Sequence, residues 1–157
     1  MELHLPADIA KQITTALSKA GHREIGGILM GEHIAEGVFE VREVTIQRMG
    51  GTFATFLRTV QDMIHSLGNF FRTTNNDYRR FNYLGEWHSH PSFAPVPSGT
   101  DHQTMREIVD DPDVGALFVL LMVVKIDESQ QFAGSVTVYQ PRGLQFEGKL
   151  IVEIPTL

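Results

Sequence analysis

The sequence contains no cysteine. This absence excludes disulfide bonds, a thiol nucleophile and any metal site built with thiolate ligands. It removes the cysteine proteases from the candidate enzymes, and also the zinc deaminases, which hold their metal partly through cysteine. A catalytic metal in this chain would therefore depend on histidine and carboxylate ligands.

The chain also lacks a long apolar run and an excess of basic residues. Its longest apolar run, 116–124, is too short for a membrane-spanning helix but suits a strand buried on both faces. The N-terminus shows neither the positive region nor the apolar region of a signal peptide. The formal net charge of -6 argues against a broad basic face for nucleic acid. We expect a cytoplasmic protein that binds neither membrane nor nucleic acid.

The chain of 157 residues, of which 42% are hydrophobic, suits one domain spanning 1–157. No repeat or internal linker interrupts it. Apolar periodicity predicts a mixed sheet with helices packed on it, an α/β fold. Helices are expected over 6–20, over 59–73 and from about 101 to 111. Strands are expected over 24–31, 38–46, 83–90, 117–125, 135–140 and 144–154, with the last two as antiparallel edge strands. The pattern over 52–59 is ambiguous and is interpreted as a short strand.

Two histidines and an aspartate lie close together in the second half of the chain. One residue separates His88 from His90, seven residues lead on to Ser98, and two more precede Asp101. In an extended segment, residues i and i+2 point to the same side with their Cβ atoms roughly 6–7 Å apart, so two imidazoles can converge on one ion. Two imidazoles and a carboxylate form the ligand set of a catalytic zinc site, whose fourth position stays open for water. We therefore expect His88 and His90 at a strand end, with Asp101 returning across a loop.

Three prolines stiffen this loop, Pro91, Pro95 and Pro97. Thr100 followed by Gln103 fits a capping box and predicts a helix that starts near Asp101. The carboxylate would then lie in the first helical turn, where the helix dipole favours its ionised form.

A hydrolase with such a site also needs a group that takes the proton of the attacking water. Glu86 lies two residues before His88, so strand parity places it on the ligand face. Glu24 is distant in sequence but precedes Gly26 and Gly27, whose missing side chains permit close backbone approach. Spacing alone does not choose between the two glutamates.

Three segments together resemble the JAMM metalloproteases, also called the MPN+ or JAB-domain family. The segments are Glu24-x-Gly26-Gly27-x-Leu29-x-Gly31, Gly85-Glu86-Trp87-His88-Ser89-His90-Pro91 and Ser98-x-x-Asp101. The spacing of the histidines, serine and aspartate is highly specific, and the resemblance covers almost the whole chain in the order of its elements. It implies the JAB/MPN architecture, a three-layer, cytidine-deaminase-like fold in which helices flank a mixed sheet.

The resemblance also implies a role for each matching residue. His88, His90 and Asp101 would bind one Zn²⁺ ion per chain. Glu24 would be the general acid/base, and Ser98 would hydrogen-bond the oxyanion of the tetrahedral intermediate.

Three neighbouring polar residues receive no catalytic role. Glu86 falls where the family varies and is interpreted as a polar residue near the pocket rim. Ser89 is expected to point away from the metal, and His102 is expected on the surface of the helix.

Enzymes of this family hydrolyse the bond after the C-terminal glycine of ubiquitin or a ubiquitin-like protein. The segment 83–92 is similar to stand-alone JAB deconjugases of bacterial anti-phage operons of the CBASS type, which also encode E1- and E2-like proteins. The resemblance therefore implies a metalloprotease acting as an isopeptidase, with a conjugated protein as substrate and E1- and E2-like proteins as candidate partners. The extended tail of the modifier is expected to lie beside a sheet edge.

Three other functions stay open at this point. A JAB peptidase could trim a ubiquitin-like sulfur-carrier protein, which a panel of substrates would distinguish from a deconjugase. A non-catalytic MPN scaffold would bind metal without hydrolysing any conjugate. A JAB relative associated with DNA repair would shift on DNA in a salt-sensitive way.

A cluster of basic residues, Arg72, Arg79 and Arg80, precedes the aromatic pair Phe81 and Tyr83. Its simplest interpretation is a solvated helix end or loop. The functional alternative is a docking patch for an acidic partner.

Overall fold

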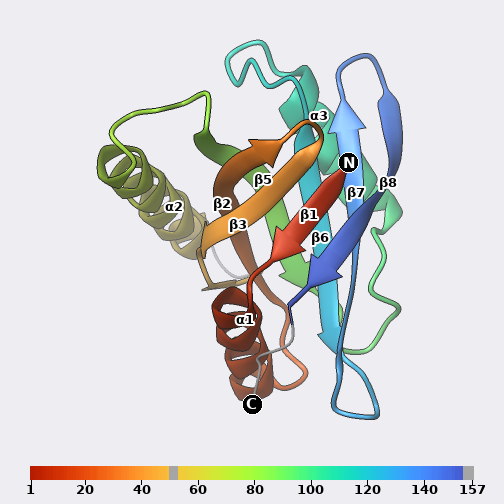
Figure 1. Cartoon of the computed structure of the whole chain (residues 1–157). Helices are drawn as coiled ribbons and strands as arrows, with labels where there is room; N and C mark the ends of the chain where they lie inside the picture. Colours follow the sequence, from red (N-terminus) through yellow and green to blue (C-terminus); the bar gives the residue numbers. More distant parts are fainter. Residues whose placement is uncertain (50–52, 154–157) are drawn as a thin grey trace.

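The part of the chain that the computed structural model describes is a strongly curled mixed sheet with three helices packed against it (Figure 1). The structure describes residues 1–49 and 53–153. The helices are α1 (Ala7–Ala20), α2 (Phe53–Thr73) and α3 (Gly99–Asp110). The strands are β1 (Glu2–Leu5), β2 (Ile25–Ala35), β3 (Val38–Val44), β4 (Gln47–Arg48), β5 (Phe81–Ser89), β6 (Val119–Ile126), β7 (Phe132–Gln140) and β8 (Leu144–Val152).

The sheet closes on itself. Its strands follow the order β3-β1-β8-β7-β6-β5-β2-β4, and β3 also pairs with β2. The pairs β1–β3, β1–β8 and β5–β6 are parallel, whereas the remaining pairs are antiparallel. The predicted mixed α/β fold is therefore confirmed, and its sheet forms a ring of strands to which the two-residue β4 is added.

The N-terminal strand β1 accounts for one wrong expectation about the sheet. It pairs with both β3 and β8, so β7 and β8 have neighbours on both sides and are not edge strands. Leu3 and Leu5 of β1 are buried while Glu2 and His4 are half-buried, which is the alternation of a strand. This alternation was visible in the sequence, but four residues are too few to establish a strand alone.

The segment 53–59 was also assigned wrongly. The structure begins α2 at Phe53, so this segment is helical and not a short strand, whereas position 52 lies outside the described residues. The helix continues through the predicted range to Thr73. The apolar pattern over one or two helical turns does not distinguish a helix from a strand. The amphipathic pattern over 59–73 is long enough to indicate a helix, and α2 extends from it back to Phe53.

The helices divide the hydrophobic core into three clusters. The largest lies between α1 and the inner face of the sheet and includes Ile13, Leu29, Trp87, Leu120 and Val138. Phe70 of α2 packs with Ile28 and Met30 of β2. Met105 and Val109 of α3 pack on Val119, Leu121 and Val123 of β6. Because Trp87 points into the inner cluster, strand alternation directs His88 to the outer side of the sheet, where α2 and α3 pack.

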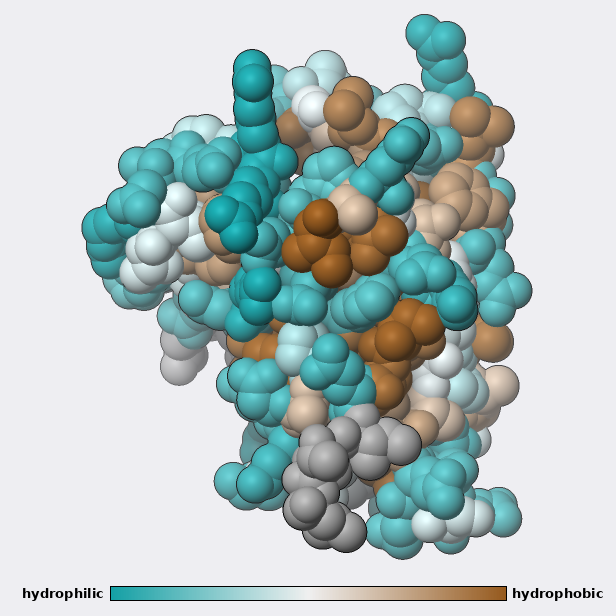
Figure 2. Space-filling model, viewed as in Figure 1, coloured by the Kyte–Doolittle hydropathy of each residue, from teal (hydrophilic) through white to brown (hydrophobic). Residues whose placement is uncertain are grey.

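Figure 2 shows a mostly hydrophilic face with small, separate hydrophobic patches. Among the described residues, no helix is long and apolar enough to cross a membrane.

Gly85 lies where β5 meets β6 and has a backbone that favours glycine. Its φ is +148°, and a Cβ atom at this position would lie 1.9 Å from the carbonyl oxygen of Leu120. Gly85 is paired with Leu120 in the parallel β5–β6 ladder, so the backbone has little room to move away. Because of this close approach, the residues of β5 from Gly85 to Ser89 can pair with β6.

We expect Gly85→Ala to lower the free energy of unfolding by about 2 kcal/mol or more, because it combines backbone strain with overpacking. Urea denaturation followed by circular dichroism measures this loss. Gly68→Ala is the matched control, since nothing lies within 4 Å of its added Cβ and alanine favours the helix by roughly 0.5–1 kcal/mol. Equal stability of the two variants would contradict the proposed role of Gly85.

Candidate active site

The site begins with the pairing of β2 and β5. Gly26 is the register partner of His88, and a Cβ on Gly26 would lie 2.4 Å from the carbonyl oxygen of Trp87 and 2.9 Å from the Cβ of His88. Glycine at this position therefore lets the two strands approach closely beside the first histidine. The expectation that Gly26 permits close backbone approach is confirmed.

Glu24 directly precedes β2 and is held from both sides. The buried hydroxyl of Ser89 accepts a hydrogen bond of 3.0 Å from the backbone N–H of Ile25. On the other side, the N–H of Met49 donates to the carbonyl oxygen of Glu24 at 3.1 Å. Ser89 does not line the cavity around His88, in agreement with its expected direction, and it ties the Glu24 end of β2 to β5.

Three side chains form a group that could hold a metal ion: His88, His90 and Asp101. The Nε2 atoms of the two histidines are 3.1 Å apart. Oδ2 of Asp101 lies 3.5 Å from Nε2 of His88 and 3.8 Å from Nε2 of His90. His88 lies at the end of β5, His90 directly follows the strand, and the aspartate comes from the first turn of α3. The predicted convergence at a strand end is therefore present.

The hydrogen bonds and the burial of the two imidazoles suit metal binding. Nδ1 of His90 lies 3.1 Å from the carbonyl oxygen of Ala94, which can only accept, so Nδ1 donates to it and Nε2 is the atom that faces His88 and Asp101. Burial lowers the pKa of His88 below its usual value, and the charge of His90 acts in the same direction against Asp101 and Glu24. His88 is therefore neutral at pH 7 and can also donate a lone pair.

Asp101 is positioned by a capping box at the start of α3. The Ser98 hydroxyl accepts from the N–H of Asp101 at 3.2 Å, and the N–H of Ser98 donates to Oδ2 of Asp101 at 2.6 Å. Burial would raise the pKa of Asp101, but the hydrogen bonds from the hydroxyl and the N–H of Ser98, together with the electrostatic effect of His88 and His90, lower it. The predicted capping box of Thr100 and Gln103 is wrong, because α3 begins two residues earlier than that pair requires.

Glu24, Ser98 and the three candidate ligands line one cavity of about 510 Å³. The structure therefore brings together every residue that the sequence resemblance selected. The cavity also includes residues that sequence reasoning did not assign to the site, among them Met49, Phe93 and Val96. Met49 follows β4 and carried no signal, whereas Phe93 and Val96 belong to the proline-rich loop.

Glu86 differs from Glu24 in its surroundings. It is half-buried, does not line the cavity, and has a raised pKa because of burial and the charge of Asp101. A raised pKa suits a base, but a base must first reach the water that it deprotonates. The cavity therefore favours Glu24 over Glu86.

His102 does not lie simply on the helix surface as expected. It is half-buried, and its Nδ1 lies 2.7 Å from the hydroxyl of the buried Tyr139. Position 102 lies on the same side of α3 as Met105, which packs in the cluster between α3 and β6. This side of the helix faces the sheet, so His102 reaches Tyr139 of β7. His102 therefore helps to seat α3 on the sheet.

Comparisons with known proteins agree with this geometry. The chain is 29% identical over 139 residues, 85% of its length and 72% of the relative's, to a protein of Enterobacter hormaechei subsp. hoffmannii named CD-NTase/cGAS isopeptidase. A Vibrio cholerae protein of the same name is 53% identical over 38 residues, 24% of each chain. The solution structure of protein DSY2949 from Desulfitobacterium hafniense superposes with a TM-score of 0.65 at 14% identity, covering 98% of this chain and 94% of that one, so it shares the fold. Residues 6–135 match the family described as prokaryotic homologs of the JAB domain. The chain belongs to this JAB family.

Proposed function

We propose that this JAB protein is a zinc-dependent isopeptidase that removes a protein conjugated in a ubiquitin-like manner from its target. The observation that carries the proposal is the convergence of Glu24, Ser98 and the His88–His90–Asp101 group on one cavity. The names of the two bacterial relatives support the isopeptide bond as the substrate and CBASS-type defence as the pathway.

The three donors fit a zinc ion. A tetrahedral ion with ligand bonds of about 2.0–2.1 Å has its ligands about 3.3–3.4 Å apart, and the three donor atoms are separated by 3.1–3.8 Å. Two imidazoles and one carboxylate leave room for one further ligand. When bound, zinc supplies Lewis-acid chemistry, which acidifies water and polarises a carbonyl oxygen.

Glu24 would move the proton between water and the leaving group. Its carboxylate takes the proton as water attacks the scissile carbonyl carbon, and it later gives that proton to the lysine nitrogen as the C–N bond breaks. The same group thus acts as base and then as acid. The hydrogen bonds from the N–H of Ile25 to Ser89 and from the N–H of Met49 to the carbonyl oxygen of Glu24 hold the backbone at this position, beside the cavity that Glu24 lines.

Ser98 would stabilise the negative charge that develops on the carbonyl oxygen. Its hydroxyl lines the cavity and accepts from the N–H of Asp101, and its own hydrogen would turn from the Asp101 carboxylate to the oxyanion. A donor that is fixed before the reaction stabilises the transition state more than one that must reorient.

The substrate tail would reach the cavity in an extended conformation. Because the described sheet closes on itself, the strand with an unpaired side next to the cavity is β4, which pairs only with β2 and leads into Met49. Main-chain pairing with β4 would orient the tail.

The same proposal includes three further expectations. The protein would work with E1- and E2-like partners, it would act in the cytoplasm, and residues 1–157 would form a single catalytic domain.

We expect Glu24→Gln to lower kcat for an isopeptide-linked conjugate by about 10²-fold or more, since general acid–base catalysis contributes that much, while zinc stays bound. Glu86→Gln is the matched control and should keep most of the activity. Gel-based cleavage of a lysine-linked conjugate measures both. If the effects of the two substitutions are exchanged, Glu86 is the base.

Ser98→Ala should lower kcat by roughly 10²–10³-fold if its hydroxyl is an oxyanion donor. Ser98→Thr, which keeps a hydroxyl and an N-cap, should recover much of that loss. Steady-state kinetics with the same conjugate provide the measurement. A loss of tenfold or less in the alanine variant would leave Ser98 only as a helix cap.

His88→Ala should weaken zinc binding by more than the roughly 10–100-fold that follows loss of a second-shell partner, because it removes a ligand. Titration calorimetry with zinc, and the metal content after dialysis, measure this. His65→Ala is the control, since His65 is an exposed residue of α2. Unchanged zinc content in the His88 variant would remove the proposed metal centre.

A further inference from the structure

We propose that a second cavity, at the opposite end of β5 from the metal centre, binds an acidic peptide segment with aromatic or branched side chains from a partner protein. This cavity has a volume of about 610 Å³ and is lined by residues from β2, α2, the turn before β5 and the segment before β6. Figure 1 shows that the turn and this segment lie at the same end of the sheet. The β5 residues that line the cavity, Asn82 to Leu84, are four to six residue steps from His88, which is roughly 13–20 Å along the strand.

The walls of this cavity are aromatic. His33 stacks on Phe39 with ring centroids 4.8 Å apart, and Phe39 contacts Phe118 at 4.9 Å. On the α2 side, Phe71 meets Tyr78 edge to face at 4.9 Å. Aromatic walls favour a ligand with aromatic or branched side chains. Such side chains bury apolar surface when they pack on the rings in an offset or edge-on arrangement.

The rim of the cavity exposes large apolar side chains. Tyr78 is 54% exposed, Val114 is 47% exposed and Leu117 is 84% exposed. All three line the cavity, so apolar surface continues from its floor to the solvent. Three exposed apolar side chains around one cavity suit a binding site better than single exposed residues scattered over a surface do.

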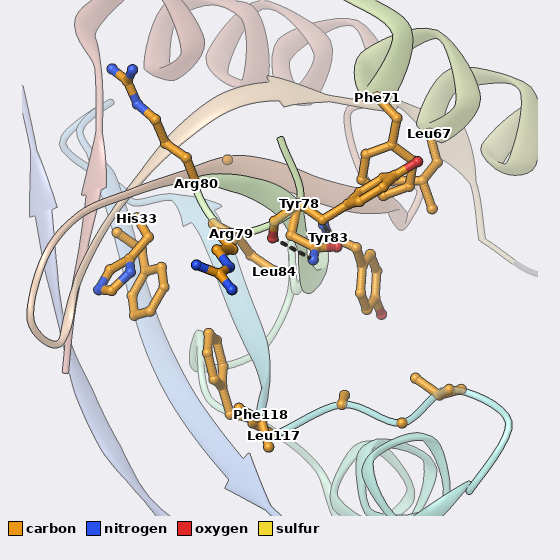
Figure 3. A pocket seen from close by; sticks show the side chains of 16 residues that line it. His33, Leu67, Phe71, Tyr78, Arg79, Arg80, Tyr83, Leu84, Leu117 and Phe118 are labelled. Atoms are coloured by element: carbon orange, nitrogen blue, oxygen red, sulfur yellow. Dashed lines mark hydrogen bonds between the residues drawn. The ribbon is translucent and has the colours of Figure 1, made fainter. Parts of the chain in front are cut away.

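Arg79 adds a positive charge to this apolar cavity. In Figure 3 its side chain reaches into the cavity on the side of His33 and Phe118, whereas Arg80 extends away. Arg80 is engaged elsewhere, since its Nε donates to the buried Glu32 at 2.5 Å. Among the described residues, no acidic side chain forms an ion pair with Arg79. Its guanidinium is therefore available for a carboxylate, which it can bind through two parallel hydrogen bonds.

Charge and backbone together identify the occupant as an acidic peptide. The chain carries a formal net charge of -6, so a cationic cavity with aromatic walls is a local exception that would discriminate among partners. The rim segment 114–118 belongs to no strand, and no hydrogen bond of the described residues uses the N–H of Ala116 or Leu117. Those N–H groups can pair with the main chain of a bound peptide. The docking-patch interpretation of this arginine cluster therefore applies to Arg79, whereas Arg72 bonds to Asn69 on α2.

The test is direct binding of a defined peptide to the isolated protein. A hexapeptide with a fluorescent label, fluorescein-Ser-Asp-Phe-Glu-Leu-Ser-amide, is titrated with the protein by fluorescence polarisation, and its binding site is located by changes in the ¹⁵N chemical shifts of the protein. We expect the shifts to gather at residues 114–118. The peptide in which Asn and Gln replace Asp and Glu should bind at least about tenfold more weakly, because a charged hydrogen-bond partner is lost.

The matched protein variants are Arg79→Gln and Arg106→Gln. Both remove one positive charge, but Arg106 lies on α3 and bonds to Gln145, away from this cavity. Arg79→Gln should lower the affinity for the acidic peptide by about tenfold, whereas Arg106→Gln should leave this affinity unchanged. Circular dichroism confirms that both variants fold. A Leu117→Ser variant should also weaken binding by removing the exposed apolar rim.

Several results would overturn the inference. These are equal affinity for the acidic and amide peptides, an unchanged affinity in Arg79→Gln, shifts in the 93–98 loop, or no binding at about 1 mM peptide. A dimer in sedimentation that Leu117→Ser abolishes would assign the cavity to a second copy of this chain instead. Because the assay needs neither zinc nor hydrolysis, its failure would leave the proposed isopeptidase function untouched.

Discussion

The antiparallel pairing of β2 with β5 is the contact on which the rest of the site depends. The glutamate directly precedes β2, whereas His88 lies in β5 and His90 directly follows it, so the pairing joins residues more than sixty positions apart in the sequence. The pairing is tight because glycine occupies position 26, and a buried hydrogen bond from Ile25 to Ser89 secures its end. A side chain at Gly26 would push apart the same backbones that bring Glu24, His88 and His90 together.

The two ends of β5 serve different kinds of chemistry. Its C-terminal end presents imidazoles beside a cavity with a carboxylate and a hydroxyl, and its N-terminal end follows a turn that places a cation among aromatic rings. The strand between them is buried on its inner side by Leu84 and Trp87, so both ends are held by the same rigid element. A conjugated protein held at both ends would gain affinity without any change in the reacting groups, because the second contact becomes intramolecular.

Much of this arrangement was predictable from local patterns, and the remainder depended on contacts between distant segments. The spacing of His88 and His90 predicted convergence because strand parity is a local property. The assignment of Glu24 was different, since spacing left Glu86 equally eligible and only the family resemblance preferred Glu24. The cavity lining supports that preference through the fold. Closure of the sheet by β1 was not predicted. A strand of four residues is too short to identify from its own pattern, and its pairing with β3 and β8 depends on segments far from it in the sequence.

The capping box of α3 has a thermodynamic consequence. One carboxylate oxygen of Asp101 both accepts the N–H of Ser98 and faces the two imidazoles. Fraying of the first helical turn and dissociation of a cation from the three donors are therefore linked equilibria. A cation would raise the melting temperature of this turn, and a loosened turn would release the cation. Metal occupancy and local helix order thus report on each other.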